Sequence, residues 1–168
     1  KNNFSNLENV LDLGTGSGCI AIEISKIFDS AAIFGSDICE KALKVAKKNN
    51  NQSKNKVNFI KSNWFSDIEG QFDLIVSNPP YIPKGTKLEA STLFEPKVAL
   101  FSKGTGFEDL KKIISEAISY LKINGALILE HGMGQSSELS SYMKKIGYKN
   151  IGTLNDLKDI NRFVYGYK

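Results

Sequence analysis

The chain has 168 residues, of which 41% are hydrophobic and 24% charged, and its formal net charge is +4. These values are typical of one soluble globular domain. No apolar run reaches the length of a membrane span, and the first residues lack the apolar stretch of a secretory signal. Cys19 and Cys39 have neither metal-ligand spacing nor the density of a disulfide scaffold. We therefore expect a cytoplasmic protein without a metal site.

The positive charge comes almost wholly from lysine, because Arg162 is the only arginine. A lysine cluster surrounds an Asn-rich turn, at Lys44, Lys47, Lys48, Lys54 and Lys56. Proteins that read nucleic acid usually rely on the arginine fork for phosphates and base edges. We interpret the cluster as a solvated face and expect a monomer with no direct nucleic-acid specificity.

Strand and helix signals alternate along the chain. In order, the patterns predict a strand at 10–13, a helix that buries Ile20, Ile24 and Ile27, a strand at 31–35, a helix with Ala42, Leu43 and Ala46, strands at 57–61 and 72–77, a helix from Leu110 to Leu121, a strand at 126–130 and a helix with Leu139, Met143 and Ile146. Two β-rich pieces, around Ile151 and at 163–165, predict an antiparallel hairpin at one edge. Apolar strands between amphipathic helices indicate a parallel sheet covered on both faces. We predict a doubly wound α/β domain.

Asn78-Pro79-Pro80-Tyr81 directly follows the apolar run of residues 72–77. Proline cannot continue a strand ladder and restricts the residue before it, so Asn78 and the carbonyl of Pro79 are held in fixed directions. An amide oxygen beside a fixed carbonyl gives two acceptors that can hold both hydrogens of one planar NH2 group. Taken alone, the four residues fit a plain proline-terminated turn equally well. The glycine loop upstream favours the functional interpretation.

Gly14-Thr15-Gly16-Ser17-Gly18 lies between the first strand and the first helix, at the sheet edge where ligands of such folds bind. Glycines let a ligand approach the backbone closely, and free N–H groups at the helix start are expected to face it. A dinucleotide loop would need glycine where this chain has Cys19. The observed G-x-G-x-G spacing, preceded by Asp12, resembles the S-adenosylmethionine loop of class I methyltransferases.

Two carboxylates flank this loop. Asp37 ends the second strand, where a carboxylate can accept both hydroxyls of a ribose. A cap for the helix that starts at Cys39 and Glu40 is an alternative for Asp37, and we favour ribose binding because of its place in the fold. For Asp12, a satisfied strand-end carboxylate and a water-mediated contact to the methionine tail of a cofactor are equally compatible.

The residues after the fourth strand permit methyl transfer to a planar amino group. Such a group is a weak nucleophile because its lone pair is delocalised, and accepting both its hydrogens returns electron density to nitrogen and aims it. His131 is the only histidine, and no general base is evident near the motif. Tyr81 offers a ring face for stacking, with a hydrophobic plug under the loop as the alternative.

With these motifs in place, the chain resembles class I methyltransferases that act on conjugated amino groups. Further segments narrow the resemblance: residues 62–66, Phe94-Glu95-Pro96, Gly106 with Asp109, and Glu130-His131-Gly132. Together they are similar to the HemK/PrmC-type peptide chain release factor glutamine methyltransferases, from about Val10 to the C-terminus. The resemblance implies a mostly parallel, seven-stranded Rossmann-like sheet and S-adenosylmethionine as methyl donor. It also implies methylation of the glutamine side-chain amide in the Gly-Gly-Gln motif of release factors.

The resemblance implies two sets of contacts. Cofactor binding is implied for Asp12, Gly14, Thr15, Gly16, Ser17, Gly18, Asp37, Ile38, Asn63, Trp64 and Asn78, with Trp64 beside the adenine. Substrate binding is implied for Asn78, Pro79, Pro80, Tyr81, Phe94 and Glu95, and Asn78, Pro79 and Tyr81 are the catalytic candidates. A helix start explains Phe94 and Glu95 equally well. We interpret His131 as a strand-end support. Asp156, Asp159 and Arg162 match a family pattern near the final hairpin, which we interpret as an ion pair instead of a site.

Two departures from the family pattern are visible. Asn63 stands where the family usually has Asp, although an amide can still accept or donate a hydrogen bond. Family members carry an N-terminal helical domain that helps to hold the release factor, and this chain begins shortly before the first strand. We therefore expect residues 1–168 to be a catalytic-domain fragment that retains cofactor binding.

Two other functions are compatible with the motifs. Adenine-N6 and guanine-N2 methyltransferases of DNA or RNA use a similar Asn-Pro-Pro-aromatic motif, but they must extract a base from its strand. The chain has no insertion large enough for a recognition domain. A non-catalytic module that keeps the cofactor pocket and scaffolds a partner is the other function, and the intact Asn78 motif argues against it.

Overall fold

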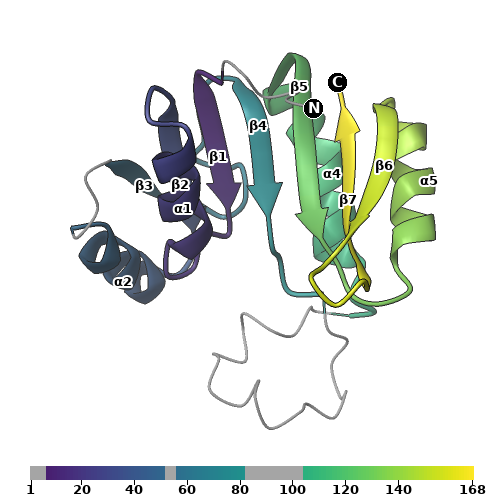
Figure 1. Ribbon diagram of the computed structural model, residues 1–168, viewed down its shortest axis with the longest axis horizontal. Helices are drawn as coiled ribbons and strands as arrows, with labels where there is room; N and C mark the ends of the chain where they lie inside the picture. The colour runs from purple at the N-terminus through teal and green to yellow at the C-terminus, as the bar shows by residue number, and fades with distance from the viewer. Residues whose placement is uncertain (1–6, 52–55, 82–103) are drawn as a thin grey trace, which may run out of the picture.

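The computed structural model describes residues 7–51, 56–81 and 104–168, which form one mixed sheet flanked by helices (Figure 1). The strands are β1 (Asn9–Leu13), β2 (Ala32–Asp37), β3 (Val57–Lys61), β4 (Phe72–Ser77), β5 (Leu121–Glu130), β6 (Lys149–Asn155) and β7 (Asn161–Tyr167). The helices are α1 (Cys19–Ile27), α2 (Glu40–Asn50), α4 (Glu108–Tyr120) and α5 (Ser136–Ile146).

The strands lie in the order β3-β2-β1-β4-β5-β7-β6. The first five of these pair in parallel, while β7 pairs antiparallel with both β5 and β6. The predicted doubly wound sheet with a C-terminal antiparallel hairpin is therefore confirmed. Because the arrowheads of β1, β4 and β5 point the same way, the loops that follow these strands meet at one edge of the sheet (Figure 1).

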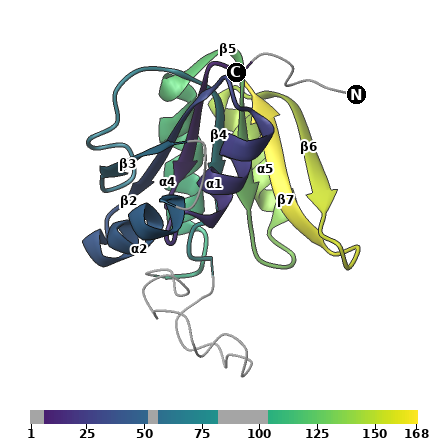
Figure 2. The same ribbon diagram turned by 60° about the vertical axis from the view of Figure 1, so that its left-hand side comes forward.

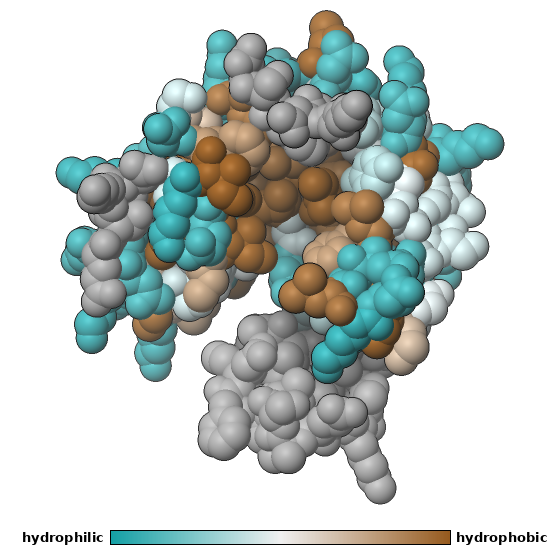
Figure 3. All heavy atoms as spheres, viewed as in Figure 1, coloured by the Kyte–Doolittle hydropathy of each residue, from teal (hydrophilic) through white to brown (hydrophobic). Residues whose placement is uncertain are grey.

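The described helices lie on both faces of the sheet. Figure 2 shows α1 and α2 on one side and α4 and α5 on the other. Side chains alternate along β1, so that Val10 packs on the α1 side while Leu11 and Leu13 pack in the larger core under α4 and α5. Hydrophobic side chains gather over the centre of the α1 side (Figure 3), where Ile128 and Tyr167 are only half-buried. Among the described helices, none is long and apolar enough to cross a membrane.

The predicted buried face of α1 is wrong for two of its three isoleucines, whereas Ile24 is half-buried and packs against the smaller core. Ile20 and Ile27 are 39% and 70% exposed, and the buried residues are Ala21, Ile22 and Ser25. The backbone N–H of Ala21 donates to Asp12 Oδ2 across 3.1 Å, which turns this side of the helix toward β1. Small side chains on that side let the helix lie close to the sheet, a contact that the spacing of isoleucines does not reveal.

The boundary between α4 and β5 also differs from the prediction. The helical period was expected to run through Leu121 and the strand to begin at Ala126, whereas β5 begins at Leu121. Leu121 is fully buried and pairs with Phe72, and the register with β4 shifts before Ala126. Asn124 has a φ of +64°, so the Asn-Gly pair forms an irregularity inside the strand instead of a turn before it.

Candidate active site

The motifs predicted from the sequence meet at the carboxyl edge of the parallel strands. The glycine loop follows β1, Asp37 ends β2, the segment with Asn63 and Trp64 follows β3, and Asn78 follows β4. Because β2, β1 and β4 are neighbours in the sheet, Asp37, the loop and Asn78 lie side by side. Phe94 and Glu95 lie outside the described residues.

The glycine loop combines a packed end with an open middle. Gly14, Gly16 and Gly18 have φ values of +77°, +56° and +83°, a region that disfavours side chains. A Cβ on Gly18 would lie 3.0 Å from Cβ of Ala46 and 3.1 Å from Cζ of Phe59, so Gly18 lets α2 and β3 pack against the loop. A Cβ on Gly16 would meet no atom of the described residues within 4 Å. The space over Gly16 is therefore where a ligand can approach the backbone.

The N–H groups of four residues of the glycine loop have partners within the protein. The N–H groups of Gly14 and Thr15 both donate to the carbonyl of Ser36 across 2.8 Å, and that of Gly18 donates to Thr15 O across 2.9 Å. The N–H of Gly16 donates to Asp37 Oδ2 across 2.9 Å. Three of these donors hold the loop to the end of β2, and that of Gly18 closes the loop on itself, so the loop offers a ligand its shape more than its hydrogen bonds.

Asp37 has two backbone partners. Besides Gly16, its carboxylate accepts a 2.7 Å hydrogen bond from the N–H of Cys39, directly before α2. The cap alternative weighed for Asp37 is wrong, because Cys39 is the N-cap residue of α2 and no side-chain hydrogen bond caps that helix. Asp37 instead fixes the turn before it. Each carboxylate oxygen has more than one lone-pair direction, so Asp37 can also accept hydroxyl groups of a ligand.

Asp12 is a buried carboxylate with one satisfied oxygen. Its Oδ2 accepts hydrogen bonds from Thr15 Oγ1 across 2.6 Å and from the N–H of Ala21 across 3.1 Å. Burial raises the pKa of Asp12 to about 6. Its Oδ1 is buried and has no partner among the described residues. A buried acceptor of this kind fits a donor brought by a ligand or a water, directly below the glycine loop.

The segment after β3 places an aromatic ring against the loop. Trp64 has a φ of +54° and is half-buried, with its Cζ3 3.5 Å from where a Cβ of Gly14 would lie. The turn is fixed by the hydroxyl of Ser62, which donates to Trp64 O across 2.7 Å, and by that of Ser66, which donates to Asn63 O across 2.6 Å. Asn63, directly before Trp64, and Ile38, directly after β2, are both exposed, so their side chains are available to a ligand.

The segment after β4 exposes Asn78, while the residues on both sides of it are held in place. Asn78 is exposed, while Pro79 behind it is buried and Pro80 and Tyr81 are half-buried. The hydroxyl of Ser77 donates to Leu13 O across 2.6 Å, which joins the end of β4 to the end of β1. The Tyr81 side chain packs against the larger core, as the hydrophobic-plug alternative requires. Its hydroxyl donates to Glu130 Oε1 across 3.0 Å.

His131 and the residues of the final hairpin make contacts that hold the fold together. His131 is fully buried, its N–H donates to Arg162 O across 2.9 Å, and its Nδ1 lies 2.8 Å from Gly132 O. These contacts support the interpretation of His131 as a strand-end support. The predicted ion pair is confirmed for Asp156, since Arg162 Nε lies 3.8 Å from Asp156 Oδ2. Asp159 Oδ1 instead accepts a 2.8 Å hydrogen bond from Asn155 Nδ2.

Sequence reasoning missed Gln135, which is buried between two loops of this edge. It accepts a 2.8 Å hydrogen bond from the N–H of Gly132 and donates to Gly106 O across 3.4 Å. A single glutamine after a strand carries no spacing signal, because its partners are backbone groups of another loop. The carbonyl of Ser36 was missed for the same reason.

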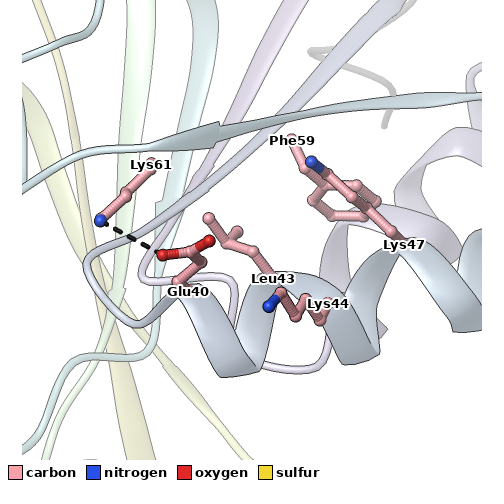
Figure 4. A pocket seen from close by; sticks show the side chains of 6 residues that line it. All are labelled: Glu40, Leu43, Lys44, Lys47, Phe59 and Lys61. Carbon is pink, nitrogen blue, oxygen red and sulfur yellow. Dashed lines mark ion pairs between the residues drawn. The ribbon is translucent and has the colours of Figure 1, made fainter.

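A separate pocket of about 260 Å³ lies between α2 and β3, three strands away from Asn78 (Figure 4). It is lined by Glu40, Leu43, Lys44, Lys47, Phe59 and Lys61. Lys61 Nζ lies 3.5 Å from Glu40 Oε2, and both side chains are exposed. Within the described residues, no group of three His, Cys, Asp or Glu side chains could hold a metal ion.

Comparison with known proteins decides the family. Residues 2–147 match the family described as "Methyltransferase small domain". The chain belongs to this methyltransferase family.

Two relatives show which members of the methyltransferase small domain family the chain resembles. The chain is 38% identical to the release factor glutamine methyltransferase of Buchnera aphidicola, over 99% of this chain and 61% of that protein. It is 40% identical to the bifunctional methyltransferase of Rickettsia typhi, over 93% of this chain and 31% of that protein. The chain thus spans less than two thirds of either relative. The resemblance to release factor glutamine methyltransferases is confirmed.

Solved structures confirm the fold. A methyltransferase from Pyrococcus furiosus superimposes with a TM-score of 0.75 at 22% sequence identity, covering 96% of this chain and 75% of that chain. Likeness at this identity concerns the arrangement of the sheet and helices alone. The predicted Rossmann-like methyltransferase sheet is thereby confirmed.

Proposed function

We propose that residues 1–168 are a catalytic domain that transfers a methyl group from S-adenosylmethionine to the glutamine side-chain amide in the Gly-Gly-Gln motif of a peptide chain release factor. The observation that carries the proposal is the exposed Asn78 on a buried Pro79, beside the glycine loop at the carboxyl edge. The similarity to release factor glutamine methyltransferases supports the choice of substrate. Because that substrate acts in translation, we infer a cytoplasmic location.

The residues around the loop fit the cofactor. S-adenosylmethionine would supply an electrophilic methyl group and has an amino-acid tail, a ribose and an adenine. The buried Oδ1 of Asp12 below the loop matches the tail, which carries the donors that this oxygen lacks. Asp37 can accept the ribose hydroxyls, and Ile38, Asn63 and Trp64 offer surface for the adenine. The space over Gly16 admits the connection between them.

The substrate amide would be held by two acceptors of one segment. The side-chain oxygen of Asn78 and the carbonyl of Pro79 accept the two hydrogens of a planar NH2 group, which turns the nitrogen lone pair in a fixed direction. Positioning then supplies most of the acceleration. We assign the departing proton to water, because His131 is fully buried and its Nδ1 faces Gly132 O.

Mass spectrometry of a purified release factor, incubated with this chain and S-adenosylmethionine, tests the proposal. The expected result is one methyl group on the tip glutamine, and none on a release factor whose tip glutamine is replaced by alanine. Parallel reactions with duplex DNA and ribosomal RNA test the alternative substrate class. Methyl transfer to nucleic acid alone would overturn the proposed substrate, and cofactor binding without any transfer would favour a scaffold.

A further inference from the structure

Tyr81 is held from two sides, by Glu130 and Gly132 on one side and by Gly106 on the other. On the side-chain side, its hydroxyl donates to Glu130 Oε1 across 3.0 Å. Gly132 lies against its ring, because a Cβ on Gly132 would be 3.3 Å from Tyr81 Cδ2. On the backbone side, Gly106 is buried with a φ of +95°, and a Cβ there would overlap the carbonyl oxygen of Tyr81.

Gln135 joins these two sides. Its side-chain oxygen accepts the N–H of Gly132 across 2.8 Å, and its side-chain nitrogen donates to Gly106 O across 3.4 Å. The residue is only 8% exposed, so both hydrogen bonds are largely shielded from water. Tyr81, Gly106, Gln135, Gly132 and Glu130 therefore form a closed circuit of contacts, which we name the Tyr81 clamp.

The Gly106 side of the Tyr81 clamp is braced by Glu108. Its carboxylate accepts hydrogen bonds from the N–H of Thr105 at 3.0 Å, the hydroxyl of Thr105 at 3.0 Å and the N–H of Gly106 at 3.1 Å. These donors fix the turn that presses Gly106 against Tyr81. The turn directly precedes α4, whose buried residues anchor it to the larger core.

The Tyr81 clamp lies just downstream of the proposed acceptor pair. Upstream, Ser77 is fixed by its 2.6 Å hydrogen bond to Leu13 O. Downstream, Tyr81 is the next residue with described contacts that hold it to another strand end. The directions of the Asn78 side chain and the Pro79 carbonyl are thus set by anchors at both ends of a five-residue segment. A displacement of about 1 Å at a reacting group can cost about 100-fold in rate.

We propose that Glu130 and Gln135 are positioning residues that fix the Asn78 and Pro79 acceptors through Tyr81. They set the turnover rate without contributing to cofactor affinity. The catalytic part of this inference rests on the proposed function, whereas the clamp itself is a property of the fold.

Paired variants separate this role from a general effect on folding. Glu130→Leu removes the acceptor for the Tyr81 hydroxyl, while Glu130→Gln keeps an acceptor oxygen at the same place. We expect Glu130→Leu to lower kcat about 10- to 100-fold with KM for the release factor within a few-fold. Glu130→Gln should recover most of that loss. The control Glu69→Leu, at an exposed carboxylate in another loop, should leave kcat unchanged.

Gln135→Glu tests the second half of the circuit. A carboxylate can still accept the N–H of Gly132, but it cannot donate to Gly106 O and repels that carbonyl. We expect a loss of kcat similar to that of Glu130→Leu, with cofactor affinity within a few-fold of wild type. If Glu130 acts through Tyr81, the double variant Tyr81→Phe with Glu130→Leu should be no slower than the slower single variant.

Hydrogen exchange gives a readout that does not depend on activity. In Glu130→Leu and Gln135→Glu, the amides of Tyr81, Thr105 and Gly106 should exchange faster, while those of β1 and β4 keep their protection. Unchanged exchange at these three amides in both variants would overturn the Tyr81 clamp. Faster exchange with unaltered kcat, or additive losses in the double variant, would overturn the positioning role. If wild-type protein methylates no release factor, the proposed function and that role fail together, and the exchange result still decides the clamp.

Discussion

Asp37 accepts the backbone N–H of Gly16 across 2.9 Å, which ties the end of β2 to the loop that follows β1. The other oxygen of the same carboxylate accepts the N–H of Cys39 across 2.7 Å. One side chain thus shapes the glycine loop and the approach to α2. In the proposed function it also faces the ribose, so its loss acts on the protein and on the ligand together.

Asp37→Ala should weaken S-adenosylmethionine binding about 10- to 100-fold, which corresponds to about 1.4–2.7 kcal/mol. The free energy of unfolding should fall as well, by about 1–3 kcal/mol, because two backbone donors lose their acceptor. Calorimetric titration and urea unfolding measure the two effects. Asp29→Ala, at an exposed carboxylate after α1, is the matched control. Unchanged affinity in Asp37→Ala would leave this residue with a structural role alone.

Asp12 should make the protein less stable as pH rises from about 4 to 6. Burial raises its pKa from 3.8 to about 6, so the folded state binds more protons than the unfolded state in that window. Its contribution is complete below the unfolded pKa and lost as pH rises through the folded pKa. The difference amounts to roughly 3 kcal/mol between the two ends of the window.

Asp12→Asn tests this sign directly. The amide keeps an acceptor for Thr15 and Ala21 but does not titrate. Urea unfolding of both proteins from pH 3.5 to 7 should show that the variant gains relative stability as pH rises, on the order of 3 kcal/mol across the window. Parallel pH profiles for the two proteins would show that burial does not raise this pKa.

The strands of the site were predictable because each is an apolar run that stops at a residue unable to continue it. The runs at 57–61 and 72–77 match β3 and β4 residue for residue. Gly14 and Pro79 mark the stops after β1 and β4, and parallel strands bring such stops to one edge. The place of the glycine loop beside Asn78 thus followed from local signals and one rule of topology.

The hydrogen bonds of the site were not predictable from those signals. The loop donors of Gly14 and Thr15 end on a carbonyl of β2, and Gln135 reaches a carbonyl 29 residues earlier in the chain. A backbone acceptor looks the same in every residue, so no residue type indicates which carbonyl will face a loop. The buried side of α1 was not predicted for a related reason. It is set by the hydrogen bond between the N–H of Ala21 and Asp12, which the spacing of apolar residues does not indicate.

Gly16→Ala and Gly18→Ala should differ in their effects although both glycines have positive φ. Each alanine pays about 1–2 kcal/mol for the left-handed backbone. Only at Gly18 would the new Cβ press on Ala46 and Phe59, at 3.0 and 3.1 Å, which adds about 1–3 kcal/mol of overpacking. Urea unfolding should therefore rank Gly18→Ala as the less stable variant. Equal losses would show that α2 moves away at no cost.

The same pair should rank in the opposite order for the ligand. The Cβ of Gly16→Ala points into the open space over the loop, where the proposed cofactor lies. We expect calorimetry to show weaker S-adenosylmethionine binding in Gly16→Ala than in Gly18→Ala, although Gly16→Ala loses less stability. Binding that is stronger in Gly16→Ala than in folded Gly18→Ala would place the cofactor elsewhere on this edge.

Asn78→Ala should greatly slow methyl transfer with little effect on the rest of the protein. Removing one preorganised group that stabilises a transition state typically costs about 100- to 1,000-fold in kcat. The side chain is exposed, so the free energy of unfolding should change by no more than about 0.5 kcal/mol. Mass spectrometry of the release factor, calorimetry with S-adenosylmethionine and urea unfolding measure the three quantities on one preparation.

Asn58→Ala, at an exposed asparagine on β3, controls for the loss of an amide at the surface. It should match wild type in turnover, cofactor affinity and stability. Normal turnover in Asn78→Ala would remove the role proposed for that residue. A large loss of cofactor affinity would instead make Asn78 part of the cofactor site first. Because Pro79 contributes a backbone carbonyl that no substitution removes, some residual rate in Asn78→Ala is the expected signature of a shared grip on the amide.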